Sequence, residues 1–471
     1  MISRPPHRMV QLNAGSRPNR PRPQAAVAEH TEHSISAAVS PTHHNQPGLN
    51  GLSACGTSGL TTGVFQINAV QPVRYVIEEV SGLFDVRNET MLRGVVPDSF
   101  PCQPTVLPVH TPGQRRFVVM DDNVYRIYGH RVQSYFATHG VECRILPLPT
   151  NEANKSFDLV FEIARQMEDF KLNRRKEPIV AIGGGVCLDV TGLAANLYRR
   201  NTPVIKVPTT LMAAVDASVG IKTAVNFDNR KNKMGTYCPP LAVFIDRSFL
   251  RTLDQRNLSN GAAEMLKMAC IKDAPLFEVL EAHGKELIAR HFQSPAASVA
   301  MRRSIQGMLE ELEYNLWEHV LCRVVDYGHA FSPEIEMAAL AHGDELLHGE
   351  AVNIDMALTT QLAYDRGLVS LEERNRVYRV MKRLQLPFWH PVCCTQLFCK
   401  GLLDTTKARD GLQRVPLMAG IGAATFVNDL TREEIAAAAA QLHALAEAES
   451  GAVASNIVAT RPASLDLALA T

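Results

Sequence analysis

The stretch Ile179-Val-Ala-Ile-Gly-Gly-Gly-Val-Cys-Leu-Asp-Val-Thr-Gly-Leu-Ala-Ala-Asn-Leu-Tyr-Arg-Arg200 decides the expected fold. Four apolar residues lead directly into three glycines, and small and apolar residues follow at helical spacing, which predicts a buried parallel strand, a tight turn and a helix. Glycines let the backbone approach an anion closely, and the start of the following helix favours negative charge. The spacing is neither G-x-G-x-x-G nor a Walker A loop. The stretch alone therefore leaves two interpretations open: a phosphate or nucleotide site, or a plain strand-turn-helix connection.

The composition is that of a globular protein with a substantial core. Hydrophobic residues make up 46% and charged residues 20% of the 471, a length that fits two or three domains. Lys plus Arg and Asp plus Glu number 48 each, so no nucleic-acid partner is expected. There is no run of about 18 apolar residues, so no membrane-spanning helix is expected. The ten cysteines include no C-x-x-C pair, which favours a reducing, cytoplasmic setting over a disulfide framework.

The two ends of the chain differ in composition from the middle. Residues 1–70 are rich in Pro, Ser, Asn, His and Gly, and five arginines precede the first acidic residue, Glu29. Such a segment buries too little apolar surface to offset its ordering entropy, which predicts a disordered extension. An Arg-rich, acid-poor start is also typical of organelle transit peptides, and this alternative stays open. A second loose tail is expected over residues 448–471.

Residues 71–246 are predicted to form an α/β nucleotide-binding domain. Strand patterns cover residues 73–80, 116–123, 142–146, 179–182, 204–207 and 242–246, and helical patterns cover residues 124–139 and 157–170. The order strand-helix-strand-helix-strand predicts a doubly wound, mainly parallel sheet.

Residues 247–447 are predicted to form a mainly α-helical domain that binds a metal and the substrate. Helical periodicity marks residues 260–283, 297–316, 349–366, 371–384 and 432–446. Either Ser259 or Asn260 is placed to cap the first of these helices. We expect the ligand in a cleft between the two halves.

A metal site is predicted from one glutamate and two histidines. Glu264 and Lys267 lie three residues apart on one helical face, and such a pair is commonly solvated. The residues around them are apolar, however, and a buried Glu needs a partner. His329 and His348 supply one, because one Glu and two His with an open position resemble catalytic zinc sites. Each histidine alone would more often be structural, and the ligand types do not separate Zn from Co, Fe or Mn.

A polar stretch follows the strand at residues 204–207. It contains Asp216, Lys222, Asn226 and the basic cluster at residues 230–233. Lysine and arginine there could neutralise a phosphorylated substrate. The alternative is a solvated run of charges, although apolar residues at 215, 217, 219 and 221 argue against full exposure.

Seven motifs in order resemble the sugar phosphate cyclases, whose best-known member is 3-dehydroquinate synthase, over residues 72–445. The motifs are Gly183-Gly-Gly-Val-Cys-Leu-Asp189, Pro208-Thr-Thr210, Asp216-Ala-Ser-Val-Gly-Ile-Lys222-Thr-Ala-Val-Asn226, Lys231-Asn232, Ala263-Glu-Met-Leu-Lys267, Gly328-His329 and Leu347-His-Gly-Glu350. The resemblance implies a dehydroquinate synthase-like fold.

The resemblance also implies cofactors, a substrate and an assembly. It implies a tightly bound NAD that is reduced and reoxidised within one turnover, and one divalent metal, zinc before cobalt, held by Glu264, His329 and His348. It places NAD contacts at Asp121, Asn123, Glu152, Lys155, Gly184, Gly185, Asp189, Thr209, Thr210 and Lys231. It places catalytic contacts to the substrate at Asp216, Lys222, Asn232 and Lys267. It further implies a homodimer in which Arg200 reaches the substrate phosphate bound to the other subunit.

Departures from the dehydroquinate synthase pattern indicate a branch of the family. Asp326 and Pro333 stand where that enzyme has an asparagine and a histidine, and Asp326-Tyr-Gly-His-Ala-Phe-Ser-Pro333 resembles the branch that cyclises sedoheptulose 7-phosphate with loss of phosphate. Similar to that branch are also Asn315-Leu-Trp-Glu318, Trp389-His390-Pro391 and Arg409-Asp-Gly-Leu-Gln-Arg414. Residues 195–206 and 260–270 are more similar to the members that form desmethyl-4-deoxygadusol, which is therefore the expected product. The alternatives are 2-epi-5-epi-valiolone synthase, 3-dehydroquinate synthase, a metal-dependent alcohol dehydrogenase and a non-catalytic binding protein.

Overall fold

The computed structural model describes residues 67, 72–95, 106–110, 115–228 and 230–459. Every element below belongs to one compact unit, Gln71–Thr471. The extension predicted for residues 1–70 lies outside the described residues except for Ile67. Every helix among the described residues is either too short or too polar to cross a bilayer.

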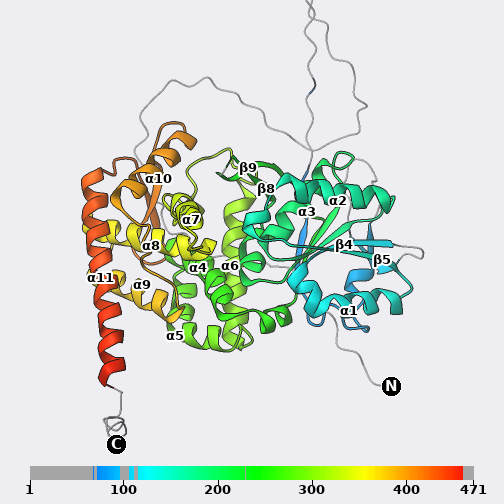
Figure 1. The fold of residues 1–471 in the computed structure, drawn as a ribbon, viewed down its shortest axis with the longest axis horizontal. Helices are drawn as coiled ribbons and strands as arrows, with labels where there is room; N and C mark the ends of the chain where they lie inside the picture. The colour runs from blue at the N-terminus through cyan, green and yellow to red at the C-terminus, as the bar shows by residue number, and fades with distance from the viewer. Residues whose placement is uncertain (1–66, 68–71, 96–105, 111–114, 229, 460–471) are drawn as a thin grey trace, which may run out of the picture. The chain divides into compact units, whose positions relative to one another are not determined.

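A sheet of six parallel strands organises the first half of this unit (Figure 1). Its order is β1-β10-β7-β6-β4-β5. The strands are β1 (Val76–Glu79), β4 (Arg115–Asp121), β5 (Glu142–Leu148), β6 (Ile179–Gly183), β7 (Val204–Pro208) and β10 (Ala242–Ile245). β6, β7 and β10 are buried along their whole length, as expected for strands covered on both faces. The predicted parallel sheet is confirmed.

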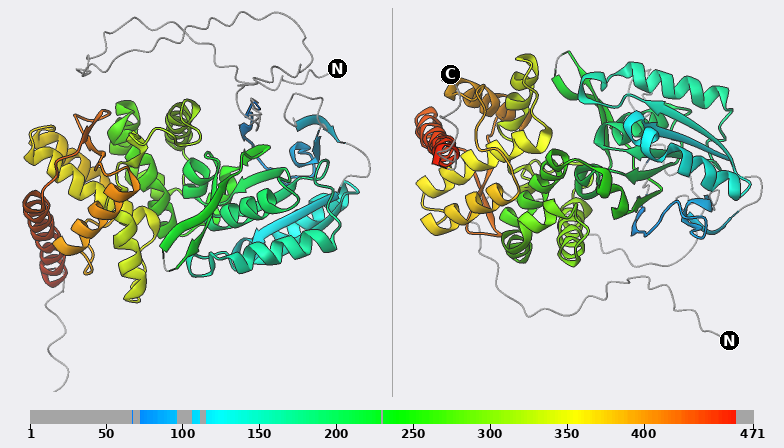
Figure 2. Two further views of the ribbon diagram at one scale, coloured as in Figure 1. Left: turned by 90° about the horizontal axis from the view of Figure 1, so that it is seen from above. Right: turned by 60° about the horizontal axis from the view of Figure 1, so that its bottom comes forward.

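Helices cover both faces of the sheet (Figure 2). They are α1 (Asp122–Thr138), α2 (Phe157–Asp169) and α3 (Gly185–Leu197). Successive residues of a strand point to opposite faces. Val118 accordingly packs in one core with Val132 of α1, whereas Phe117 packs in another with Ile163 of α2 and Val190 of α3. This is the doubly wound arrangement that the sequence predicts.

The strand order reverses between β4 and β6. From β4 the chain crosses by α1 to β5 on one side, and from β6 it crosses by α3 to β7 on the other. Ligands of open α/β sheets bind at the carboxyl ends of the strands at such a reversal. The two ends that meet here carry Asp121 and Gly183.

An antiparallel hairpin that the sequence patterns did not predict follows β7. It consists of β8 (Lys222–Phe227) and β9 (Arg230–Tyr237), and a short π-helix, η3 (Ala213–Ala217), precedes it. Two further pairs of strands are β2 (Arg93–Val95) with β3 (Val106–His110), and β11 (Val415–Met418) with β12 (Ala424–Val427). Short 3-10 helices are η1 (Thr90–Leu92), η2 (Glu152–Asn154), η4 (Arg247–Thr252) and η5 (Val324–Asp326).

The second half is mainly helical, as predicted. Its helices are α4 (Gln255–Ile271), α5 (Ala274–Ala289), α6 (Pro295–Glu313), α7 (Ser332–Ala341), α8 (His348–Asp365), α9 (Leu371–Arg383), α10 (Thr395–Ala408) and α11 (Arg432–Ala459). α4 and α8 run through the middle of this half (Figure 1), and their buried residues lie in its single large core. Both helices carry predicted metal ligands.

Several boundaries differ from the sequence prediction. The helix expected over residues 260–283 is two helices, because Asp273 caps α5 and Pro275 in its first turn cannot continue the preceding helix. Asp254, and neither Ser259 nor Asn260, caps α4, with its side chain accepting from the N–H of Asn257. α11 continues past residue 446 to Ala459, so the loose tail expected from residue 448 is helical up to that point. Alanine, the best helix former, is abundant in this segment.

Candidate active site

Three side chains from separate parts of the helical half converge. They are Glu264 in the middle of α4, His329 in the loop before α7 and His348 at the start of α8. Nε2 of His329 and Nε2 of His348 lie 3.8 and 3.7 Å from Glu264 Oε1, and one ligand atom from each residue lies within 4.8 Å of the others. Glu264 Oε1 is buried and accepts no hydrogen bond among the described residues. A buried carboxylate oxygen without a donor, facing two imidazole nitrogens, fits a metal cation.

Close helix packing brings these ligands together. A Cβ on Gly349 would lie 2.0 Å from the carbonyl oxygen of Asn260, so α8 can start against the backbone of α4 only with glycine there. The N–H of Gly349 also donates to Asn260 Oδ1 at 2.6 Å. Gly328, before His329, has a φ of +77° and would crowd Val352 of α8 if it carried a Cβ. The two glycines therefore set the distance from each histidine to Glu264.

Hydrogen bonds at Nδ1 orient both imidazoles. Nδ1 of His329 lies 3.1 Å from the carbonyl oxygen of Tyr327, and Nδ1 of His348 lies 3.2 Å from Glu336 Oε2. When Nδ1–H donates to these oxygens, the lone pair of each Nε2 faces Glu264. Burial lowers the pKa of His329, and the charge of Lys267 lowers it further. A neutral imidazole is the form that binds metal.

Lys267 and Asp216 border the three ligands. Lys267 Nζ lies 2.5 Å from Glu264 Oε2, and only 4% and 1% of the two side chains are exposed. Burial raises the pKa of Asp216, and the charge of Glu264 adds to this, while Lys267 and Lys222 oppose it. The Glu264–Lys267 pair is therefore buried and not solvated at the surface. The carboxylate of Asp216 and the ammonium of Lys267 can both contact polar groups of a ligand.

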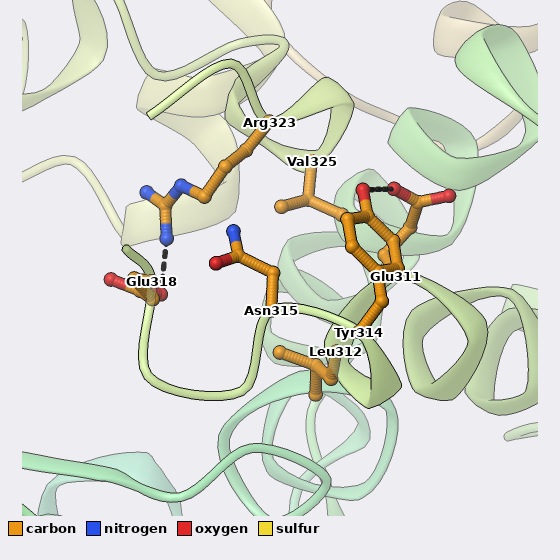
Figure 3. Close-up of a pocket in the computed structure, with 7 residues that line it drawn as sticks. All are labelled: Glu311, Leu312, Tyr314, Asn315, Glu318, Arg323 and Val325. Atoms are coloured by element: carbon orange, nitrogen blue, oxygen red, sulfur yellow. Dashed lines mark hydrogen bonds and ion pairs between the residues drawn. The ribbon is translucent and has the colours of Figure 1, made fainter. Parts of the chain in front are cut away.

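A series of ion pairs begins at Lys222, another predicted site residue. Lys222 Nζ is 2.9 Å from Glu318 Oε1, although 63% of the lysine side chain is exposed. Glu318 also pairs with Arg323, as Figure 3 shows, at a small cavity of about 10 Å³ that both residues line. Arg323 pairs in turn with Asp326, and Asp326 Oδ2 also lies 3.0 Å from Nη2 of Arg409. The series therefore links Lys222 to the turn that carries His329.

The glycine turn at the end of β6 leaves polar groups without partners. Gly184 caps α3 without a side chain, and the N–H of Thr209 donates to the carbonyl oxygen of Gly183 at 2.9 Å. The hydroxyl of Thr209 is buried and has no hydrogen-bond partner among the described residues. A Cβ on Gly183 would lie 3.2 Å from Cβ of Asp121, so Asp121 lies directly beside the turn. Together with the N-terminus of α3, these groups suit an anionic ligand.

Beside the glycine turn, polar side chains from both halves form a second network. Lys155 Nζ donates to Asp189 Oδ2 at 2.6 Å and to Asn232 Oδ1 at 2.7 Å. Glu152 Oε1 accepts from Asn226 Nδ2 at 2.8 Å and lies 3.7 Å from Lys231 Nζ. Lys231 also pairs with Glu336 of α7. Although burial opposes ionisation, His348 and Lys231 lower the pKa of Glu336 to about 2.

Two predicted site residues are exposed, and of these only Arg200 lies apart from the groups above, because the N–H of Asn123 donates to Asp121 Oδ1 at 3.0 Å. Asn123 is exposed and accepts a hydrogen bond from Arg126 of its own helix. Arg200 is exposed beyond the far end of α3, roughly 20 Å from Gly185 at the rise of an α-helix. Arg199, Arg200 and Asn201 have φ values of 48, 61 and 82°, so three successive non-glycine residues adopt the left-handed conformation. Gly185 and Thr210 lie at the glycine turn. The remaining predicted residues belong to the ion pairs that start at Lys222, to the network around Lys155, to the glycine turn or to the metal-ligand cluster.

Four charged residues of the site received no role from the sequence: Glu318, Arg323, Glu336 and Lys206. Lys206 is fully buried on β7 and donates to the carbonyl oxygens of Ala217 and Gly220, which holds the loop after Asp216. A charged residue within an otherwise apolar strand was the available signal for Lys206. Glu318 stood in a branch-specific motif, which was the only signal for that residue.

Comparisons with known proteins agree with the fold. Residues 145–260 match the family 3-dehydroquinate synthase N-terminal, and residues 261–407 match 3-dehydroquinate synthase C-terminal. A 2-epi-5-epi-valiolone synthase of Actinomyces sp is 47% identical over 82% of this chain and 99% of its own length. A demethyl-4-deoxygadusol synthase of Trichormus variabilis is 37% identical over 80% of this chain and 89% of its own.

A solved structure is similar over the same region. ValA, a 2-epi-5-epi-valiolone synthase from Streptomyces hygroscopicus subsp. jinggangensis 5008 with NAD+ and Zn2+ bound, has a TM-score of 0.74 and 46% identity. The match covers 80% of this chain and 99% of ValA. The chain therefore belongs to the sugar phosphate cyclases, the enzyme family of 3-dehydroquinate synthase.

Proposed function

We propose that this protein is a 2-epi-5-epi-valiolone synthase. It converts sedoheptulose 7-phosphate into a seven-carbon cyclitol and inorganic phosphate, with one new carbon-carbon bond and no net oxidation. NAD and one divalent metal, zinc before cobalt, serve as its cofactors. The substrate follows from the resemblance of residues 326–333 to the branch of the family that uses it.

The choice of product rests on one observation. The valiolone synthase of Actinomyces sp is 47% identical to this chain, and the demethyl-4-deoxygadusol synthase is 37% identical over nearly the same share of it. The sequence motifs favoured desmethyl-4-deoxygadusol, and this comparison favours the alternative instead. Short motifs can be shared by both members of the branch, because the two reactions differ only in a final loss of water. Identity over the whole domain samples every residue that shapes the site.

The residues present fit both cofactors. Glu264, His329 and His348 would hold the metal, which supplies Lewis-acid polarisation of substrate oxygens when bound. The turn at Gly184 and Gly185 would hold the pyrophosphate of NAD at the N-terminus of α3, and NAD supplies a transient hydride acceptor when bound. In support, Glu264 Oε1 and the hydroxyl of Thr209 are buried without hydrogen-bond partners among the described residues. ValA carries both cofactors on a similar fold.

The chain's own side chains bind and orient the substrate. Lys267 is buried beside Glu264, and although burial opposes its charge, Glu264 and Asp216 raise its pKa. Its ammonium can therefore donate to a substrate hydroxyl throughout the reaction. Asp216 can accept from another hydroxyl, and Lys222, kept in place by Glu318, can bind an anionic or carbonyl oxygen. Asn232 lies on β9, where its side chain accepts a hydrogen bond from Lys155.

We further propose that the enzyme is a homodimer and that Arg200 binds the phosphate of the substrate in the neighbouring subunit. The support is the family resemblance and the exposed, left-handed turn at residues 199–201. Left-handed backbone at bulky residues persists only where it is stabilised, and it is concentrated at functional sites. Arg200 lies past the end of α3 that is opposite to its own glycine turn.

One assay tests the reaction class. Purified protein is supplied with sedoheptulose 7-phosphate, NAD and Zn2+, and phosphate release and absorbance of NADH are followed together. We expect phosphate to appear without accumulation of NADH. Stoichiometric accumulation of NADH would contradict the proposal and support an alcohol dehydrogenase, and the absence of both signals would support a non-catalytic protein.

A further inference from the structure

Glu336 connects a metal-ligand histidine to a lysine of the opposite half of the molecule. The side chain is buried on α7, with 6% of the residue exposed. Oε2 lies 3.2 Å from Nδ1 of His348 on α8. Oε1 pairs with Nζ of Lys231 on β9. Each carboxylate oxygen therefore serves a different part of the site.

Helix packing fixes the place of this carboxylate. The start of α7 is anchored on α8, because Asp355 Oδ2 accepts the N–H groups of Phe331 and Ser332 at 2.5 and 2.9 Å. Ile335, next to Glu336, is fully buried in the core of the helical half. α7 is thus bound to the same helix that begins with His348. Glu336 is a preorganised acceptor and not a mobile surface group.

We propose that Glu336 is a positioning residue that joins the metal site to the nucleotide site. Through Oε2 it keeps Nδ1 of His348 protonated, so that Nε2 faces Glu264. Through Oε1 it holds Lys231 beside Glu152, which lies 3.7 Å away. The inference rests on the proposed function, because that function assigns the metal to Glu264, His329 and His348 and assigns NAD to the region of Lys231.

The two effects have separate physical causes. A carboxylate that accepts from Nδ1 fixes the tautomer and raises the basicity of the other nitrogen, and removing such a group typically costs about 10- to 100-fold in metal affinity. Lys231 is paired with Glu336 and lies beyond hydrogen-bond distance of Glu152. Without Glu336, Glu152 would be the one remaining carboxylate of this network near the Lys231 ammonium. Lys231 would then move away from its present position in the proposed NAD site.

The test measures binding of Co2+ and of NAD separately in the full-length protein. Co2+ affinity is read from the visible absorption of the bound ion, and NAD affinity from quenching of tryptophan fluorescence. For Glu336→Ala we expect about 10- to 100-fold weaker Co2+ binding together with weaker NAD binding, and for Glu336→Gln a smaller loss of both. Lys231→Met should weaken NAD binding more than Co2+ binding, because Lys231 reaches His348 only through Glu336.

Glu334 provides a matched control on the same helix. It pairs with Lys400 at the surface, as Glu336 pairs with Lys231 in the interior. Glu334→Gln should change neither affinity. Melting temperatures of the metal-free variants identify any loss of folding, and the glutamine variant, which keeps the volume of the side chain, carries the test if the alanine variant unfolds.

Unchanged Co2+ affinity in both Glu336 variants would overturn the inference, even if the wild-type enzyme releases phosphate as proposed. Weaker Co2+ and NAD binding in these variants would support it, even if wild-type protein fails to act on sedoheptulose 7-phosphate. Wild-type protein that binds no Co2+ would overturn both the inference and the proposed function.

Discussion

His348 Nε2 lies 3.7 Å from Glu264 Oε1, at the crossing of the two most buried helices of the second half. Neither residue is bonded to the other, and each is held by a different neighbour, Glu336 on one side and Lys267 on the other. The space between them is therefore defined by packing, before any ion binds. This preorganisation is the basis of the metal site.

Replacing Glu264 should abolish catalysis and spare the nucleotide site. Glu264→Gln keeps the size of the side chain but removes the charge that faces two imidazoles, so we expect phosphate release to fall by at least about 100-fold and Co2+ binding to be lost. NAD affinity should stay within about three-fold, since the glycine turn lies on the other half of the molecule. Phosphate assays and the two binding titrations check this. Wild-type activity in Glu264→Gln would contradict the metal assignment.

Mixing two inactive variants tests the dimer. Arg200→Ala and Glu264→Gln should each be inactive alone. If Arg200 serves the neighbouring subunit, a mixed dimer contains one site with both residues intact, and activity should return to roughly a quarter of the wild-type level after random exchange. The control is each variant exchanged with itself. No recovery in mixtures that have formed mixed dimers would place Arg200 in its own subunit's site or outside the reaction.

Glu318 should matter through Lys222. Glu318→Gln removes the charge that holds the exposed Lys222 ammonium at 2.9 Å, so kcat/KM for the sugar phosphate should fall by about five-fold, the upper end expected for an ion pair screened by solvent. Steady-state phosphate release measures the effect. Asp404→Asn, which breaks an exposed pair with Lys407 on α10, serves as the control and should keep the wild-type rate. Equal kcat/KM values for Glu318→Gln and Asp404→Asn would contradict a role of Glu318 in substrate binding.

The buried Asp355 predicts a pH dependence of stability. Burial raises the pKa of Asp355 from 3.8 to about 7, although the N–H groups of Phe331 and Ser332 oppose the rise. Between these values the folded chain binds a proton that the unfolded chain has released. The contribution to stability is therefore complete below the lower value and is lost as the pH rises to about 7, a change on the order of 1–4 kcal/mol.

The substitution Asp355→Asn isolates this group. Asparagine keeps an oxygen that can accept the two N–H groups and carries no titrating proton, so the decline between pH 4 and about 7 should be absent from the variant and should appear as the difference between the two proteins. Urea unfolding at several pH values measures it. Asp365→Asn, at the exposed end of the same helix, should retain the wild-type slope. A parallel pair of curves for wild type and Asp355→Asn would refute the expectation.

The parallel sheet and the burial of Glu264 could be predicted from sequence because their signals are local. An uninterrupted apolar run marks β6, and β7 is apolar except for Lys206. The apolar residues around Glu264 exclude an exposed helix. The hairpin β8-β9 gave no such signal, since most of its side chains are exposed or half-buried and polar. Its two strands form by hydrogen bonding to each other, and the pattern of either segment alone does not predict that pairing.

Contacts between distant segments explain what else was missed. Glu318 lies in an irregular loop, and only the folded chain brings it to Lys222. Glu336 stands on α7, a helix of ten residues that is too short for a clear periodic pattern. The motif around His329 located one ligand but carried no information on the acceptor of His348. Sequence motifs thus predicted the ligands, and the structure added the residues that we propose position them.

The product formed from sedoheptulose 7-phosphate tests the central proposal most directly. Wild-type protein is incubated with this substrate, NAD and Zn2+ until phosphate release is complete, and the product is then measured by ultraviolet absorption and by mass. We predict a cyclitol that lacks strong ultraviolet absorption, the expected behaviour of 2-epi-5-epi-valiolone. A strongly absorbing enolone, lighter by one water molecule, would contradict the proposal and restore desmethyl-4-deoxygadusol as the product.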